Sequence, residues 1–367
     1  MTKWISLVAF CFTMSWAFAA DTKTVTLLDK GEPYGAMVFH ADHLWVGHSR
    51  KNFNADYKVQ IFDRKDQLVS EIPLPHAPQV MYPYDDSSIL IVGIGHTPNL
   101  TMYTLISHRG GSFPNRTRII PMEAWANQWL GTFGGREYFT DPGGNPNDEA
   151  VTTDLTLASQ TLFRMDGDTP KYLPTRMRLP VGGVVVDKSL FVIQKDAMTG
   201  PKSNLVQVDP ATGKSSNLFA IPRQDLHVIT KVPGTSLLAI LERAANQVLI
   251  YDSVGKTLVS EVAVDRGPKP LKAMKNCLFV GSFEERSIQM LKRAPQGNFE
   301  VAAKLNNTMP TSEFKKLSEI AVDEKTGRVY ARSNFPCNPI SDSCVDDSNR
   351  VISWDALSQT IKESCRN

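Results

Sequence analysis

The feature that most constrains the fold of this chain is a unit of four short apolar strands that recurs along the sequence. In the central copy, residues 181–222, the apolar runs are separated by the turn Asp187-Lys188, a polar loop and a turn of sequence DPATGK. Short strands separated by such turn residues predict one antiparallel sheet. Repeated units of about 40 residues are typical of closed arrays of small sheets.

The same order of strands and turns can be followed in both directions from the central copy. The next copy, residues 227–264, has YDSVGK where the central copy has VDPATGK. Seven copies result, and the residues that end their second strands are His48, His96, Asp141, Gln194, Glu242, Ser282 and Arg332. Their spacings lie between 40 and 53 residues, which brackets the usual length of a propeller blade. We therefore predict an all-β, seven-bladed β-propeller with four-stranded antiparallel blades and no long helix.

The two ends of the mature chain are predicted to meet in the last blade. Residues 23–31 form a strand-like segment that has no partner in the first unit, and residues 351–359 supply a strand that lacks an outer neighbour. Pairing these segments would close the ring and remove an open sheet edge. No linker interrupts the repeats, so residues 20–367 are predicted to form a single propeller domain.

The first residues have the pattern of a secretory signal peptide. Lys3 is the only charged residue, residues 4–16 are apolar, and residues 17–19 include small side chains. This pattern predicts cleavage after residue 19 and export, either to a periplasm or as a secreted protein. No later apolar run is long enough to span a membrane as a helix, so we expect no membrane insertion. We also expect the protein to be a monomer.

The charge balance argues against two classes of partner. The chain has 40 basic and 38 acidic residues and a formal net charge of +2. Nucleic-acid and membrane-surface partners both require a concentrated basic face, which this balance does not suggest.

The cysteines fit an oxidising compartment. Four of them follow the predicted signal peptide, and Cys337 and Cys344 flank the polar loop NPISDS. In an exported protein this spacing predicts a Cys337–Cys344 disulfide. Cys277 and Cys365 form a second bridge or remain buried thiols, and the sequence leaves both alternatives open.

The turns of the repeat resemble those of the YVTN family of β-propeller repeats. Gly267-Pro268-Lys269-Pro270 and Gly31-Glu32-Pro33-Tyr34 match the turn that leads into a blade, and residues 209–214 match the turn that follows a later strand. In the second turn Asp and Thr can bond the backbone while glycine tolerates a positive φ. The resemblance implies an exported propeller with a binding role, and it assigns no catalytic residue.

Polar residues follow the second strand of every unit. Loops between blades reach the same end of a propeller and add His76, Glu123, Arg223, Asp225, His227 and Arg266. The predicted contact surface consists of His48, His96, Asp141, Lys195, Glu242, Arg243, Glu284 and Arg332. We interpret this ring of polar residues as the site at which a protein or small-molecule ligand binds, and the chain as a binding or scaffolding module.

An enzymatic function is the alternative. Lactonase-type propellers hold a divalent metal with side chains around the channel, and Glu32, Asp141 and Glu284 are the residues that would do so here. The oxygen-rich segment 141–154 suits calcium, but it lacks the alternation of a dedicated calcium loop. We therefore predict no cofactor and no catalytic residue, and leave a divalent metal as an alternative.

Overall fold

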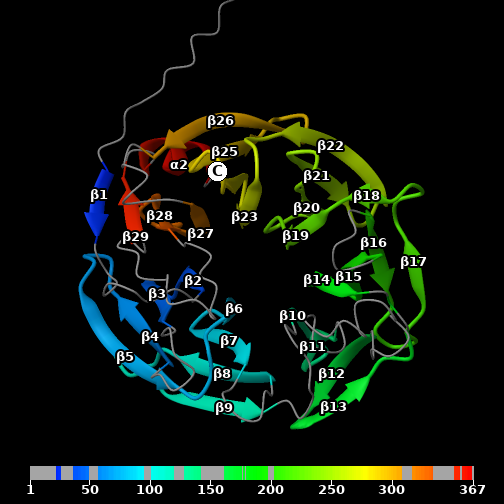
Figure 1. Cartoon of the computed structure of the whole chain (residues 1–367), viewed down its shortest axis with the longest axis horizontal. Coiled ribbons are helices and arrows are strands. Elements are labelled where there is room, and N and C mark those ends of the chain that lie inside the picture. The colour runs from blue at the N-terminus through cyan, green and yellow to red at the C-terminus, as the bar shows by residue number, and fades with distance from the viewer. Residues whose placement is uncertain are drawn as a thin grey trace, which may run out of the picture.

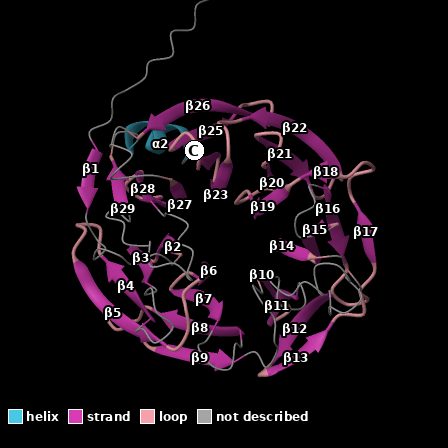
Figure 2. Ribbon diagram, viewed as in Figure 1, coloured by secondary structure: helices cyan, strands magenta, loops and turns pink. Residues whose placement is uncertain are grey.

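The computed structural model describes residues 22–25, 36–48, 57–94, 101–119, 128–141, 161–175, 177, 179–196, 202–307, 316–333, 351–355 and 358–365. Its strands form seven antiparallel sheets arranged in a ring (Figure 1). The predicted seven-bladed β-propeller is therefore confirmed. Figure 2 shows that the blades are built of strands and that the helix α2, Ser358–Cys365, lies at the perimeter.

Each blade is numbered in chain order and its strands run outward from the ring centre. Blade 1 contains β2 (Met37–His40), β3 (His43–His48), β4 (Tyr57–Phe62) and β5 (Leu68–Leu74). Blade 2 contains β6 (Val80–Asp85), β7 (Ser88–Ile94), β8 (Thr101–Ser107) and β9 (Asn115–Ile119). Blade 3 contains β10 (Trp129–Phe133), β11 (Arg136–Asp141), β12 (Thr161–Asp166) and β13 (Thr169–Tyr172).

The second half of the ring has the same organisation. Blade 4 contains β14 (Pro180–Val186), β15 (Ser189–Lys195), β16 (Lys202–Val208), β17 (Ser215–Asn217) and the short β18 (Arg223–Gln224). Blade 5 contains β19 (Leu226–Lys231), β20 (Leu237–Glu242), β21 (Gln247–Asp252) and β22 (Thr257–Ala263). Blade 6 contains β23 (Pro268–Met274), β24 (Cys277–Ser282), β25 (Ser287–Arg293) and β26 (Phe299–Asn306). Blade 7 contains β27 (Leu317–Asp323), β28 (Arg328–Ser333) and β29 (Val351–Trp354).

The second strands contain continuous apolar runs because each blade is covered on both faces. All six residues of β24 are buried. Leu278 and Val280 pack in the cluster shared with blade 5, whereas Cys277 and Phe279 pack in the cluster shared with blade 7. Alternate side chains of one strand thus enter two different cores, which is why the sequence shows continuous apolar runs.

The N-terminal strand closes the ring in the predicted blade. The strand β1, Thr22–Val25, pairs antiparallel with β29, so that Thr22 lies opposite Trp354 and Val25 opposite Val351. In Figure 1, β1 is the outermost strand beside β29. The two ends of the chain are therefore tied together by backbone hydrogen bonds, as the sequence predicts.

Side chains reinforce this closure between blades 1 and 7. The Arg64 guanidinium donates to both carboxylate oxygens of Asp323, from Nε at 2.9 Å and from Nη2 at 3.1 Å. Arg328 bonds Asp66 at 3.2 Å and Asp355 at 2.7 Å. Asp323 is 1% exposed, so this network, which we call the blade 1–7 clasp, contains a buried charge that depends on Arg64.

The turn that carries the family resemblance has the expected internal bonds. The Asp209 carboxylate accepts from the backbone N–H of Ala211 at 2.8 Å and from the Thr212 hydroxyl at 2.8 Å. Gly213 has a φ of +71°, a conformation that glycine adopts without strain. Membership of the YVTN family remains a prediction.

The structure decides between the alternatives for one cysteine pair. Cys277, the first residue of β24, forms a disulfide with Cys365 at the end of α2, with their Cα atoms 5.3 Å apart. The sequence shows no periodicity for α2, which buries Ile361 against the core between blades 6 and 7. Cys337 and Cys344 lie outside the described residues.

No helix in the part of the chain that the structure describes is long and apolar enough to cross a membrane.

Candidate functional site

The second strands end where the sequence analysis places them, at one end of the ring. The backbone N–H of Arg243 donates to the carbonyl of Asp225 at 3.0 Å, and that of Phe283 donates to the carbonyl of Gly267 at 2.9 Å. The residues after a second strand therefore lie beside the start of the first strand of the same blade. We call this end of the ring, which carries Lys195, Arg243 and Phe283, the rim.

Three of the predicted contact residues lie at the rim but do not face solvent. His48, Glu242 and Arg332 are only 2%, 3% and 1% exposed. Glu242 accepts hydrogen bonds from the backbone of Gln224 at 2.9 Å and from the side-chain amide of Gln247 at 2.7 Å. All three side chains are buried, which corrects their interpretation as a solvent-facing contact surface.

Arg332 has an identifiable role in joining blades. Its Nη1 donates to the carbonyl of Gly47 at 3.5 Å, so a residue of blade 7 contacts blade 1 at the rim. His76, which the sequence analysis places in a loop between blades, is fully buried, and its Nε2 bonds the Thr104 hydroxyl at 2.9 Å. Burial lowers the pKa of His76 to about 4. His76 is therefore a neutral core residue rather than part of a contact surface.

Of the other predicted residues, Glu284, Lys195 and Arg243 have described side chains. Glu284 is exposed and its side chain lies over Gly267. Asp141 ends β11, but its side chain is outside the described residues, as are His96, Glu123 and Glu32. The place of His96 in the contact surface thus stays a prediction.

Lys195 and Arg243 are brought together on blades 4 and 5. Both bind the carboxylate of Asp225, Lys195 Nζ at 2.8 Å and Arg243 Nε at 2.6 Å. Burial pushes the pKa of Asp225 upward, but the hydrogen bonds from these two cations outweigh it and hold the pKa below its ordinary value. One carboxylate therefore holds two cations at the rim.

His227 lies next to this group at the start of β19. Burial, and then the charges of Arg243 and Lys195, lower the pKa of His227 to about 4. The imidazole is consequently neutral above about pH 5. Above this pH, His227 therefore adds no positive charge to that of the lysines and the arginine at the rim.

Two further cations lie beside one aromatic ring on blades 6 and 7. Lys269 Nζ is 5.4 Å from the centroid of the Phe283 ring, and Lys316 Nζ is 4.4 Å from it. Within the described residues, no carboxylate lies within 4.0 Å of either ammonium. Burial lowers the pKa of Lys269, and the charges of Arg243 and Lys316 lower it further against the opposing carboxylate of Glu319.

We call Lys195, Arg243, Lys269 and Lys316 the rim cations. They belong to four successive blades, and Asp225 neutralises only part of their charge. Glu319 is paired with another lysine, Lys272, at 3.4 Å. Among the described residues, Lys269 and Lys316 are therefore the rim cations without a carboxylate within 4.0 Å, and an anionic group can neutralise them.

Register shifts between the first and second strands affect the orientation of some of these side chains. The pairing of β19 with β20 shifts register between Leu226 and Ile229, around His227. The pairing of β23 with β24 shifts between Pro268 and Leu271, around Lys269. Such bulges redirect side chains and are frequent next to functional sites.

Lys269, Lys316 and Phe283 are not among the predicted contact residues. Lys269 is part of the turn GPKP, whose pattern predicts a backbone conformation and not a charged contact. Phe283 directly follows a second strand, but an apolar residue was not expected in a polar ring. Their proximity depends on two blades and has no sequence signal.

The metal-dependent alternative gains no support from the described residues. Among them, no group of three or more His, Cys, Asp or Glu side chains is arranged to hold a metal ion. The segment 142–154, considered for calcium, lies outside these residues.

Comparisons with known proteins support the fold. A scan against protein-family models and a search of curated proteins return no match for the chain. A chain of the mitotic checkpoint complex is similar to it, with a TM-score of 0.57 and 8% identity over 96% of this chain and 98% of that chain. The Cps50 (Swd1) β-propeller domain from Myceliophteria thermophila has a TM-score of 0.57 and 10% identity, covering 90% of this chain and 98% of that one. For hydrazine synthase from Kuenenia stuttgartiensis the values are 0.55 and 12%, covering 84% and 94%. Such low identities show a common propeller fold and nothing more specific.

Proposed function

We propose that this chain is an exported β-propeller that binds an acidic segment of a partner protein at the rim of blades 4–7. The observation that carries the proposal is the pair of ammonium groups, Lys269 and Lys316, beside the Phe283 ring with no carboxylate within 4.0 Å among the described residues. A carboxylate-rich ligand would neutralise the charge repulsion that these groups exert on each other.

The spread of the rim cations favours a polypeptide over a small anion. Because the cations come from four blades, a single small ion can contact only some of them, whereas an extended chain with several carboxylates can contact them all. Phe283 is half-buried and offers an apolar surface between two of them. Two of the propellers similar in fold belong to protein assemblies or are domains of larger proteins, which is consistent with a binding module.

Charge reversal at the rim tests the proposal. The variant Lys269→Glu/Lys316→Glu is expected to weaken binding of a Glu-rich peptide by about 100-fold, since two attractive contacts become repulsive. Titration calorimetry measures the affinity, which should also fall as the salt concentration rises. The matched control is Lys188→Glu, an exposed lysine in the turn at the opposite end of blade 4, which should bind like the wild-type protein.

Two outcomes would overturn the proposal. Equal affinity of the wild-type protein and the double variant would show that the rim cations do not form the site. No binding of the peptide at millimolar concentration, or equally strong binding of free glutamate, would remove the acidic polypeptide as the ligand.

Export is supported by the signal-peptide pattern and by the Cys277–Cys365 disulfide, since such bonds persist mainly in oxidising compartments. The mature protein is expected to begin at Ala20. N-terminal sequencing of protein recovered from the envelope or the medium measures this directly. A cytoplasmic protein that still begins at Met1 would contradict the export proposal.

A further inference from the structure

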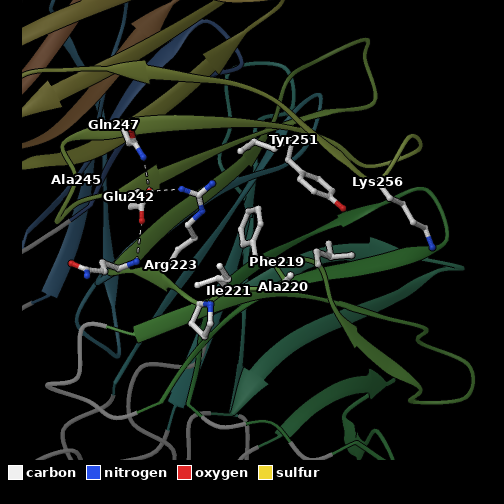
Figure 3. Close-up of a pocket in the computed structure, with 13 residues that line it drawn as sticks. Phe219, Ala220, Ile221, Arg223, Glu242, Ala245, Gln247, Tyr251 and Lys256 are labelled. Atoms are coloured by element: carbon white, nitrogen blue, oxygen red, sulfur yellow. Dashed lines mark hydrogen bonds and ion pairs between the residues drawn. The ribbon is translucent and has the colours of Figure 1, made fainter.

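A groove lies between blades 4 and 5, lined by residues 218–224 of blade 4 and by residues of blade 5 (Figure 3). It exists because the fourth strand of blade 4 is interrupted. The strand β17 pairs with β16 up to Asn217, and pairing resumes only at Arg223 in β18. The Leu218 N–H still donates to the Leu205 carbonyl at 2.8 Å, and residues 219–222 then leave the sheet and form one wall of the groove.

The interruption is held in place by a specific contact. The side chain of Asn204 in β16 bonds both backbone groups of Phe219, donating to its carbonyl at 3.0 Å and accepting from its N–H at 3.3 Å. The Phe219 ring is thereby inserted next to Tyr251, with ring centroids 5.9 Å apart. Because these bonds replace those of the missing strand, the groove is part of the folded structure and not a local defect.

The groove is large and mainly apolar. Its volume is about 650 Å³, within the range of small-molecule sites. Leu218, Phe219 and Leu258 contribute to its lining, and Ile221 at its edge is 79% exposed. Ile221 thus extends the apolar surface of the groove to the outside of the molecule.

The two ends of the groove differ in their polar groups. At the rim end, Arg223 bonds Glu261 at 2.6 Å and lies 3.7 Å from Glu242. These groups already satisfy one another, and Glu242 also has its bonds from Gln224 and Gln247. The rim end therefore offers no unpaired charge to a ligand.

The opposite end of the groove carries two hydrogen-bond donors that no described side chain pairs with. Tyr251 is 1% exposed, and within the described residues its hydroxyl has no hydrogen-bond partner. Lys256, in the turn after β21, is exposed and has no carboxylate within 4.0 Å among the same residues. Figure 3 shows the Tyr251 hydroxyl on the side of its ring that faces Lys256.

A buried hydroxyl without a partner is costly, so its presence in a groove needs an explanation. Burial, and then the nearby Asp252, raise the pKa of Tyr251, so the hydroxyl keeps its proton and remains a donor. The Asp252 carboxylate does not accept a hydrogen bond from the Tyr251 hydroxyl. It accepts instead from the backbone N–H of Val254 in the turn, at 3.0 Å. The unpartnered Tyr251 hydroxyl and the Lys256 ammonium, which line the same groove, both favour an acceptor with negative charge.

We propose that this groove binds an apolar monocarboxylate of the medium-chain fatty acid type. Its carboxylate accepts hydrogen bonds from the Tyr251 hydroxyl and from Lys256 Nζ, and its hydrocarbon chain lies along Phe219 and Ile221. The site is separate from the rim cations and does not depend on the function proposed for them.

The test uses octanoate as the probe and titration calorimetry as the measurement. The variant Tyr251→Phe is expected to weaken octanoate binding by about tenfold or more, because a hydrogen bond to a charged acceptor is lost. Lys256→Gln should weaken it by about threefold to tenfold, as expected for an exposed charge. Octanol, which has the same chain without the charge, should bind more weakly than octanoate and be insensitive to Lys256→Gln.

Controls separate binding from folding. Tyr251→Phe should melt at the same or a higher temperature, because it removes an unpaired buried hydroxyl and keeps the ring. Lys188→Gln should bind octanoate like the wild-type protein, and so should the rim variant Lys269→Glu/Lys316→Glu. Absence of octanoate binding at millimolar concentration, or equal binding by the Tyr251→Phe variant, would overturn the proposal.

Discussion

The double variant Cys277→Ala/Cys365→Ala is expected to lose about 2 to 5 kcal/mol of unfolding free energy. The disulfide joins residues separated by 88 positions, and a cross-link that closes a long loop restricts the unfolded chain strongly. It also holds the helix α2, whose Ile361 is buried against blades 6 and 7. Urea denaturation followed by circular dichroism measures the difference.

A reducing agent provides the control for this prediction. It should lower the stability of the wild-type protein toward that of the double variant. Any further loss that the reducing agent causes in the variant would measure the predicted Cys337–Cys344 bridge. Equal stability of the variant and the oxidised wild-type protein would contradict a structural role for the Cys277–Cys365 bond.

The second large effect is expected at the blade 1–7 clasp. Asp323→Asn should lower the free energy of unfolding by about 2 to 3 kcal/mol, since removing the buried partner of Arg64 leaves it only the exposed carboxylate of Asp42, at 2.8 Å. We place the effect below that of a fully buried pair because the Arg64 side chain is 25% exposed. The Thr326 hydroxyl also bonds Asp323, at 2.6 Å, so the substitution disturbs the turn as well as the ion pair.

The same variant gives a pH dependence of known sign. Burial raises the pKa of Asp323, but the hydrogen bonds from Arg64 and Thr326 outweigh it, and the pKa lies below the ordinary value of 3.8. A lowered carboxylate pKa contributes stability that is complete above the unfolded value and is lost as the pH falls through the folded value. The difference between wild-type protein and Asp323→Asn should therefore be constant above about pH 5 and shrink below about pH 4.

Asp187→Asn is the matched control, because Asp187 is 72% exposed and its ion pair with Lys231 is long, at 3.7 Å. Surface pairs of this kind contribute less than about 1 kcal/mol. A clasp variant no less stable than this control, or a difference that does not change down to pH 2, would contradict the role assigned to Asp323.

The repeat made most of the fold predictable. Strand order, turn positions and blade number follow from local patterns, such as the turn at Asp187 and the Asp209 turn whose internal bonds the structure contains. The closing strand was also predictable, because residues 23–31 lacked a partner within their own unit. Here local sequence and global topology agree, which is what a repetitive fold requires.

The rim could be located from the sequence, but not the direction of its side chains. Glu242 and Arg243 are neighbours in the chain, yet Glu242 is buried in a hydrogen-bonded network and Arg243 reaches Asp225 at the surface. Alternation along a strand places successive side chains on opposite faces, but a register shift at the start of the first strand changes which one is exposed. The blade of Arg332, which is also buried, has such a shift between Leu317 and Glu319.

The sequence by itself determined the seven-bladed ring, its closing strand and the end of the ring where the second strands finish. Only the tertiary structure brought Lys269, Lys316 and Phe283 together, interrupted the outer strand of blade 4 at Asn217, and paired Arg64 with Asp323. The physical reason is the separation along the chain between the residues that interact. A strand and its turn are encoded by adjacent residues, whereas contacts between blades join side chains that can be more than 250 positions apart in the chain, and no local pattern specifies them.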